Sequence, residues 1–297
     1  TGSSSCNNLC SSLRIMSTIL AENPLLCHIA HEISSSWCTN FGIWIVSYSL
    51  IYIIWYSLLR ETLRPWKFNP SYPPKALISR EIVRSASSVA ICCMYDSVIG
   101  MMFDFGHLTP DKPTQPTGIF GLISSGWRTV LDALVGDVHI FVGIVLWADF
   151  HFYWVHRLQH ESRWLYKHVH KVHHESSNPD PWSGLSFHPI EAALYFSSLL
   201  VVLVAPLKRW HFDVFRVSLI VSPIFGHIGF GIDSFPWGYD HFVHHSKFNY
   251  NFGSGLFPYN GIWDNVCGTG YWEGSNATTN RMKSALAQAG VVKANLD

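Results

Sequence analysis

The sequence predicts an all-α integral membrane protein, a helical bundle of about four to five spans with a histidine-rich helical cap on one side. Of the 297 residues, 48% are hydrophobic and only 13% are charged, against roughly 25% charged residues in a typical soluble domain. Aromatic residues make up 15% of the chain and include 13 Trp, which is typical of helices anchored at a membrane interface. The formal net charge is zero, so we expect no nucleic-acid partner.

The first predicted span covers residues 40–59, because this run carries no formal charge and a helix of about twenty apolar residues crosses a bilayer. Four further apolar stretches predict spans at 85–103, 133–155, 189–207 and 212–232. A short turn containing Lys208 and Arg209 joins the last two. Two alternatives stay open for this hairpin, full crossing of the bilayer and re-entry from one side.

The distribution of Lys and Arg orients these spans. Between the first two spans, residues 60–84 contain six Lys or Arg side chains and two Glu, so the positive-inside rule places this loop in the cytoplasm. Counting spans from there, the third span returns to the cytoplasmic side as His156 arrives, and the hairpin ends there before His241. We therefore predict that the histidine-rich cap faces the cytosol.

Three histidine clusters are the feature that most specifically indicates chemistry. Their patterns are H-x3-H, H-x2-H-H and H-x2-H-H, and their members are His156 and His160; His170, His173 and His174; and His241, His244 and His245. On a helix, positions i, i+3 and i+4 share one face, so one helix can give a histidine to each of two neighbouring ions. Neutral imidazole is a common ligand of iron, copper and zinc. Eight such ligands are too many for one ion, and they predict a dinuclear metal site.

Two further histidines, His188 and His227, are predicted to complete the ligand set. His188 starts the predicted hairpin, and His227 lies near the end of the fifth predicted span, where an unpaired polar ring is costly. Lone histidines within apolar spans, such as His139 and His151, are more often hydrogen-bonded structural groups. We assign no catalytic side chain beyond the metal ligands, and no residue that binds an organic cofactor.

The composition of the ligand set narrows the chemistry. It contains neither thiolate nor carboxylate, and the zinc-protease pattern H-E-x-x-H is absent from the sequence. Two irons beside a bilayer suit the activation of O2 and the removal of hydrogen from an unactivated C–H bond, which needs a dry pocket. Such chemistry also needs electrons. The sequence has no G-x-G-x-x-G dinucleotide motif, so we expect the reductant to be another protein.

A histidine-rich metal transporter or store is the alternative from another functional class. A transporter is expected to place its ligands near the middle of the membrane, along a path with broken helices. In this sequence the clusters lie at the ends of predicted spans and in the cap, which favours the enzyme.

From about Asp149 to Thr269 the sequence resembles the sterol desaturase/fatty acid hydroxylase superfamily of membrane di-iron oxygenases. The resemblance rests on the three histidine clusters in order and on the motifs around them. These motifs are Asp149–His160, His170–His174, Ser186–Glu191, His241–His245, Phe248–Gly253, Trp263-Asp264 and Gly268-Thr269. The resemblance implies the eight clustered histidines as iron ligands, with His188 and His227 as further ones. It implies structural or supporting roles for Asp149, Trp263 and Asp264.

The resemblance also implies the setting of the reaction. Members are multi-pass enzymes of the endoplasmic reticulum membrane with an active site that faces the cytosol. They use O2 and two non-haem irons, and they take electrons from NAD(P)H through a small haem electron carrier and its reductase.

The motifs His188–Glu191 and Asn249–Gly253 look like those of sterol C-5 desaturases. The resemblance therefore implies desaturation or hydroxylation of a lipid, with a sterol as the first choice. A fatty-acid or sphingolipid hydroxylase and a C-4 methylsterol oxidase remain open as alternatives. On this basis we divide the chain into an N-terminal segment, an N-terminal membrane region, a fatty acid hydroxylase/sterol desaturase catalytic domain and a C-terminal tail, at residues 1–39, 40–132, 133–272 and 273–297.

Overall fold

The computed structural model describes residues 23–108, 126–127, 131, 135–231, 238–254 and 261–271. Within these ranges the chain forms helices and no β-strand, with one isolated bridge between Lys67 and Phe230. The predicted all-α class is confirmed for this part of the chain. The predicted C-terminal tail, most of the predicted N-terminal segment, and residues 109–125 of the predicted membrane region lie outside the described residues.

Three described helices are long and apolar enough to cross a membrane. They are α2 (Pro24–Tyr52) with its π-helical continuation η1 (Ile53–Leu58), α4 (Lys75–Asp104) and α7 (Val138–Glu161). They overlap most of each of the first three predicted spans, but α2 and α4 begin well before the predicted residue, and α7 begins at Val138, five residues after it. At the start of α2 the Asn23 side chain accepts hydrogen bonds from two backbone N–H groups, and Pro24 occupies the first helical position, which is a favourable beginning for a helix.

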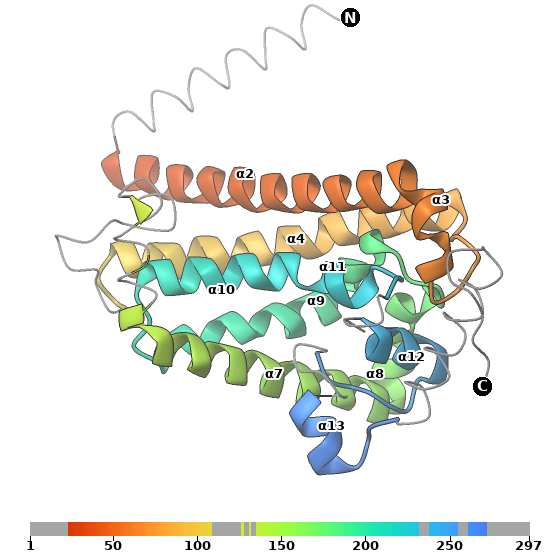
Figure 1. Ribbon diagram of the computed structural model, residues 1–297. Coiled ribbons are helices and arrows are strands. Elements are labelled where there is room, and N and C mark those ends of the chain that lie inside the picture. The colour runs from red at the N-terminus through yellow and green to blue at the C-terminus, as the bar shows by residue number, and fades with distance from the viewer. Residues whose placement is uncertain are drawn as a thin grey trace, which may run out of the picture.

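The fourth and fifth predicted spans form shorter elements. The first is α9 (Pro189–Phe196), which continues as the 3₁₀ helix η5 (Ser197–Leu203), and the second is α10 (Arg209–Val221), followed by α11 (Pro223–His227). Each is shorter than the roughly twenty residues that cross a bilayer as a helix. Their lengths therefore favour the re-entrant alternative. Figure 1 shows α9 and α10 beside the long helices α4 and α7.

A buried ionic network joins α2, α4 and α10. The guanidinium of Arg216 lies 3.1 Å from the Asp96 carboxylate and 3.4 Å from that of Asp213, and it donates a hydrogen bond to the Asn40 side chain. Asn40 in turn donates to Asp96 at 2.8 Å. Charged groups between apolar helices are costly unless they are paired. This pairing explains how α4 carries Asp96 in the middle of an apolar stretch.

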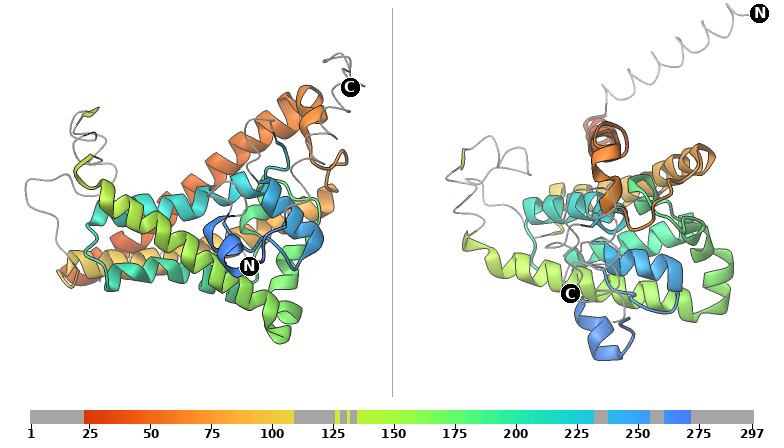
Figure 2. Two further views of the ribbon diagram at one scale, coloured as in Figure 1. Left: turned by 60° about the horizontal axis from the view of Figure 1, so that its bottom comes forward. Right: turned by 45° about the vertical axis from the view of Figure 1, so that its right-hand side comes forward.

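The shorter elements gather at the end of the bundle where α7 finishes and α4 begins (Figures 1 and 2). In chain order they are α3 (Arg60–Leu63), η2 (Arg64–Trp66), α8 (Arg163–His168), η3 (His170–Glu175), η4 (Pro181–Leu185), α12 (Tyr239–Lys247) and α13 (Gly261–Cys267). The basic segment that begins at Arg60 and the histidine clusters therefore lie at the same end of the bundle, as the sequence predicted.

The 3₁₀ helix η4 connects this end to the long helices. Asp180 caps it by accepting a hydrogen bond from the backbone N–H of Trp182 at 2.8 Å. The indole ring of Trp182 then packs against Trp44, Tyr48 and Tyr52 of α2, with ring centroids 5.8–6.3 Å apart. Aromatic pairs at this spacing are favourable, so η4 fixes the histidine-bearing elements onto the bundle.

Candidate metal centre

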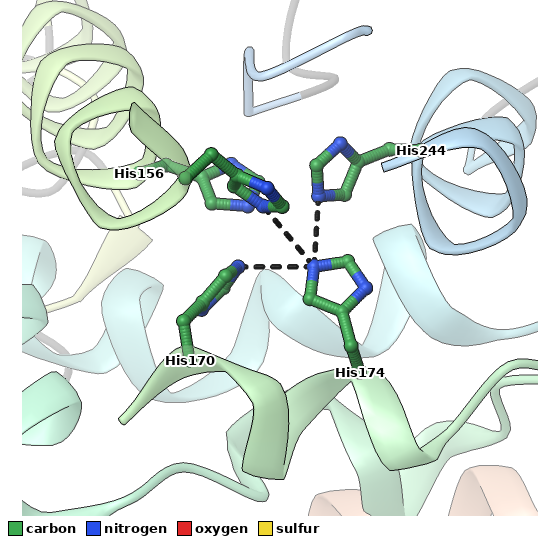
Figure 3. Close-up of side chains that lie close together, drawn as sticks. His156, His170, His174 and His244 are labelled. Atoms are coloured by element: carbon green, nitrogen blue, oxygen red, sulfur yellow. Dashed lines mark hydrogen bonds between the residues drawn. The ribbon is translucent and has the colours of Figure 1, made fainter. Parts of the chain in front are cut away.

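Nine of the ten predicted ligands converge in two groups, in each of which the candidate ligand atoms lie within 4.8 Å of one another. Group A consists of His156, His160, His170, His174 and His244. Group B consists of His173, His227, His241 and His245. In Figure 3, His170 and His244 turn their ring nitrogens toward His174. The predicted convergence of distant segments is therefore present in the fold.

The clusters divide between the groups in a way that the sequence pattern predicted only in part. The second and third clusters each serve both groups: η3 gives His173 to group B and its other two histidines to group A, and α12 gives His244 to group A and its other two to group B. The first cluster is different, because α7 gives both of its histidines to group A. The ring of His227, at the end of α11, supplies group B instead.

The distances within group A fit a shared cation. The Nε2 atom of His174 lies 3.2, 3.0 and 3.1 Å from the Nε2 atoms of His160, His170 and His244. One ring nitrogen carries either one proton or one lone pair, so it cannot make three hydrogen bonds at once. Nitrogens that bind one ion at about 2.1 Å, with angles of about 90–109°, stand about 3.0–3.4 Å apart. Group A has this spacing.

Group B has the same geometry. The Nε2 atom of His227 lies 3.3, 3.1 and 3.2 Å from the Nε2 atoms of His173, His241 and His245. The Nε2 atoms of His241 and His245 are themselves 3.2 Å apart. A closed triangle of ring nitrogens again exceeds what single protons can satisfy, so the residues of both groups fit a metal ion.

Backbone carbonyls fix the orientation of three of these rings. Their Nδ1 atoms lie 2.7–2.8 Å from carbonyl oxygens, in the pairs His156 with Phe252, His244 with Tyr250 and His227 with Pro223. Because a carbonyl oxygen can only accept, each Nδ1 carries the proton and donates it. The lone pair is therefore on Nε2, which is the atom that faces the group.

The carbonyl that orients His156 is itself held by Asp264. The carboxylate of Asp264 accepts hydrogen bonds from the backbone N–H groups of Phe252 and Gly253 at 2.9 and 2.6 Å, and from the Thr269 hydroxyl at 2.6 Å. The structural role that the resemblance implied for Asp264 agrees with these contacts. The side chain acts on the metal centre through the loop that positions the His156 ring.

Burial keeps the histidines outside the long helices neutral. It lowers the pKa of each ring well below its ordinary value, and the neighbouring imidazoles add to this effect, at His170, His173, His174, His241, His244 and His245. A neutral ring is the form that binds a metal ion. These side chains are therefore in the ligand state at neutral pH.

His188 corrects the predicted ligand set, because it lies outside both groups. It is the N-cap of α9, where its Nδ1 accepts a hydrogen bond from the backbone N–H of Ile190 at 3.2 Å. The ring accepts a hydrogen bond from a backbone N–H group in the first turn of α9, which explains why a polar side chain stands just before an apolar segment. His151 has the structural contact that the sequence predicted, since its Nε2 lies 3.0 Å from the Ser197 hydroxyl.

Glu191 is a functional residue that the sequence analysis left without a role. Its Oε1 lies 2.7 Å from Nδ1 of His170, and both side chains are buried. A signal was available, because a lone acid in an apolar segment needs a partner. The contact holds the His170 ring with its Nε2 toward group A, as carboxylates commonly do for metal-binding histidines.

Replacing Glu191 by alanine is expected to weaken metal binding at group A by about 10- to 100-fold, because the His170 ring loses its orienting partner. Chelator competition on the purified protein measures this affinity. Glu161→Ala is the matched control, since that carboxylate pairs with Arg157 at 2.7 Å on the surface. Equal metal affinities in the two variants would contradict the role of Glu191.

A cavity of about 170 Å³ leads from both groups into the bundle. Histidines of group A and group B form one end of its wall, and α7, α9 and α10 form most of the remainder. The wall is mostly apolar and includes Ile144, Phe152, Phe187, Phe215 and Leu219. A cavity of this kind admits an apolar chain or ring system and keeps water away from the metal centre.

Comparisons with known proteins agree with this geometry. Residues 141–269 match the fatty acid hydroxylase family. A probable Delta(7)-sterol 5(6)-desaturase from Neurospora crassa is 31% identical, over 45% of this chain and 38% of the relative. Cholesterol 25-hydroxylase from Mus musculus is 31% identical, over 44% of this chain and 46% of the relative. Methylsterol monooxygenase 2-2 from Arabidopsis thaliana is 37% identical, over 32% of this chain and 35% of the relative.

The chain spans less than half the length of each of these three relatives. No solved structure is significantly similar to it. The family match extends from α7 to the end of α13 and contains all three histidine clusters. Residues 141–269 therefore resemble the fatty acid hydroxylase family, and the relatives of this region support the sterol desaturase/fatty acid hydroxylase superfamily.

Proposed function

We propose that this protein is a membrane-bound, O2-dependent oxidoreductase that desaturates or hydroxylates a lipid, with a sterol as the first choice of substrate. The observation that carries the proposal is the pair of all-histidine groups at the end of an apolar cavity. Two non-haem irons, one in each group, would supply the activation of O2 and the removal of hydrogen from a C–H bond. The names of the relatives, a sterol desaturase, a sterol hydroxylase and a methylsterol monooxygenase, support a sterol.

The protein's own residues would perform three tasks. The nine histidines would bind the two irons. Nδ1 contacts to backbone carbonyls keep the Nε2 atoms of His156, His227 and His244 aimed inward. The apolar wall excludes water, and it orients an apolar substrate along α7. Because the buried imidazole rings are neutral before the metal binds, a metal ion would not have to displace a proton from them.

We further propose the endoplasmic reticulum membrane as the location, with the metal end facing the cytosol. Electrons would come from NAD(P)H through a reductase and a small haem carrier. Three basic side chains, Arg163, Lys167 and Lys171, are exposed on α8 and η3, next to the histidines of the second cluster. A positive surface at this position would attract an acidic carrier protein.

The position of the metal centre argues against a metal transporter. Both groups lie at the end of the long helices, and eight of their nine histidines are buried. A transport path requires ligands that exchange with water on both sides of the membrane, whereas these ligands form a closed centre beside an apolar cavity.

The test uses the full chain purified in detergent with iron. We expect about two irons per chain and O2 uptake that depends on an added sterol and an electron-donor system. Mass spectrometry of the product separates loss of two hydrogens from gain of one oxygen. Turnover of a fatty acid or a sphingolipid, but not of any sterol, would show that the substrate is a fatty acid or a sphingolipid and not a sterol. Stable zinc without O2 uptake after iron reconstitution would overturn the oxidoreductase.

A further inference from the structure

The wall of the cavity contains a hydroxyl group that the protein leaves without a partner. Ser198 is 2% exposed and lines the cavity, and its Oγ makes no hydrogen bond. Buried polar atoms in proteins almost always have a partner. An isolated hydroxyl that faces a cavity is therefore positioned for a polar atom of whatever fills that cavity.

The groups around Ser198 are already satisfied. The backbone carbonyl of Ser198 accepts a hydrogen bond from the Trp147 indole at 2.9 Å. The neighbouring Ser197 hydroxyl donates to the carbonyl of Leu194 at 2.7 Å and contacts His151. Only the Ser198 hydroxyl remains available at this place in the wall. It can both donate and accept, which matches an alcohol.

Two helices relate the position of Ser198 to residues that contact or belong to the histidine groups. Ser198 lies seven positions after Glu191, the residue that contacts a group A ligand, and this corresponds to roughly 10 Å along a helix. On α7, Trp147 and His151 lie nine and five positions before His156, which corresponds to roughly 8–14 Å. Ser198 and the histidine groups therefore line the same cavity from positions that are roughly 8–14 Å apart along these two helices.

We propose that the Ser198 hydroxyl binds the alcohol group of the lipid substrate and thereby selects the carbon that faces the two histidine groups. This inference rests on the proposed function. The mouth of the cavity fits entry from the membrane, because the lining residues Val145 on α7 and Ser218 on α10 are also exposed.

Binding measurements on the full chain in detergent test the anchor without turnover. The probes are cholesterol against cholestane, and hexadecanol against hexadecane, so that each pair differs by one hydroxyl. The unaltered protein should bind at least one of the alcohols about tenfold more tightly than its hydrocarbon, and Ser198→Ala should remove this preference. Ser198→Thr, which keeps the hydroxyl, should retain it.

Ser218→Ala is the matched control. Ser218 lines the same cavity, but its Oγ already donates to the carbonyl of Phe215 at 2.6 Å, so its loss should leave the preference intact. Metal content verifies that each variant is folded. No preference for either alcohol in the unaltered protein, or a preference that survives Ser198→Ala, would overturn the anchor. Loss of the preference in Gln159→Leu but not in Ser198→Ala would also overturn the anchor, because Gln159 Oε1 is another unpaired atom in the cavity wall.

O2 uptake is measured in parallel so that the two proposals can fail separately. An alcohol preference that depends on Ser198, without O2 uptake, would support the role of Ser198 and contradict the proposed oxidoreductase function. Lipid-dependent O2 uptake, with an alcohol preference that is unchanged in Ser198→Ala, would support the proposed oxidoreductase function and contradict the role of Ser198.

Discussion

Replacing His174 by alanine is expected to remove the ion of group A and to lower turnover by more than about 100-fold. Its Nε2 contacts three other ring nitrogens of the group, so it is the ligand whose loss opens the group most. Loss of a residue that merely orients a ligand costs about 10- to 100-fold, and loss of the ligand itself should cost more. Iron content per chain and lipid-dependent O2 uptake measure the two effects.

His188→Ala is the control for this variant. Both substitutions delete an imidazole from the same end of the bundle, but His188 lies outside both groups and caps α9. Loss of such a cap costs about 1 kcal/mol of stability and should leave the iron content unchanged. Full iron content and activity in His174→Ala would remove His174 from the ligand set.

Replacing Arg216 by methionine is expected to destabilise the fold by about 3–5 kcal/mol. Arg216 is 4% exposed. Its removal leaves the buried Asp96 carboxylate without the cation that lies 3.1 Å away, whereas Asp213 keeps a contact with Arg209 at 3.6 Å. Unpaired charge in this environment is the costly state. Unfolding of the detergent-solubilised protein, followed by circular dichroism, measures the change in stability.

The triple variant Arg216→Met, Asp96→Asn and Asp213→Asn separates lost charge pairing from lost packing. It removes the charges together, so it should recover most of the stability that the single variant loses. Arg163→Met, on the exposed face of α8, should change stability by less than about 0.5 kcal/mol. Equal loss in the single and triple variants would show that packing of the Arg216 side chain, and not its charge, holds these helices together.

All nine histidines that converge in the structure could be predicted from the sequence, from helix periodicity and from the cost of placing polar groups in apolar segments. Spacings of three and four residues place side chains on one face whatever the tertiary structure is. The same cost argument also selected His188, because it cannot distinguish a ring that caps a helix from one that binds a metal. The division of the rings between two groups depends on how α7, η3, α11 and α12 meet in space, which no local pattern contains.

The boundaries of the membrane helices show a similar limit. The predicted first span omitted residues 24–39, since these include polar side chains such as His28 and Glu32. In the structure His28 lies 3.1 Å from Asp104, and Glu32 lies 3.4 Å from Arg209. Polar residues in a long helix are tolerated when distant segments supply partners, and hydropathy along one segment cannot detect partners of that kind.

The 3₁₀ helix η3 has a consequence for the geometry of the proposed pair of ions. Within five residues it supplies rings to both groups, so a single covalent segment spans the gap between them. A 3₁₀ turn is tighter than an α-turn and has little freedom to stretch. If each group binds an ion as proposed, this segment would act as a short spacer that keeps the distance between the two ions nearly constant when the long helices tilt slightly in bilayers of different thickness.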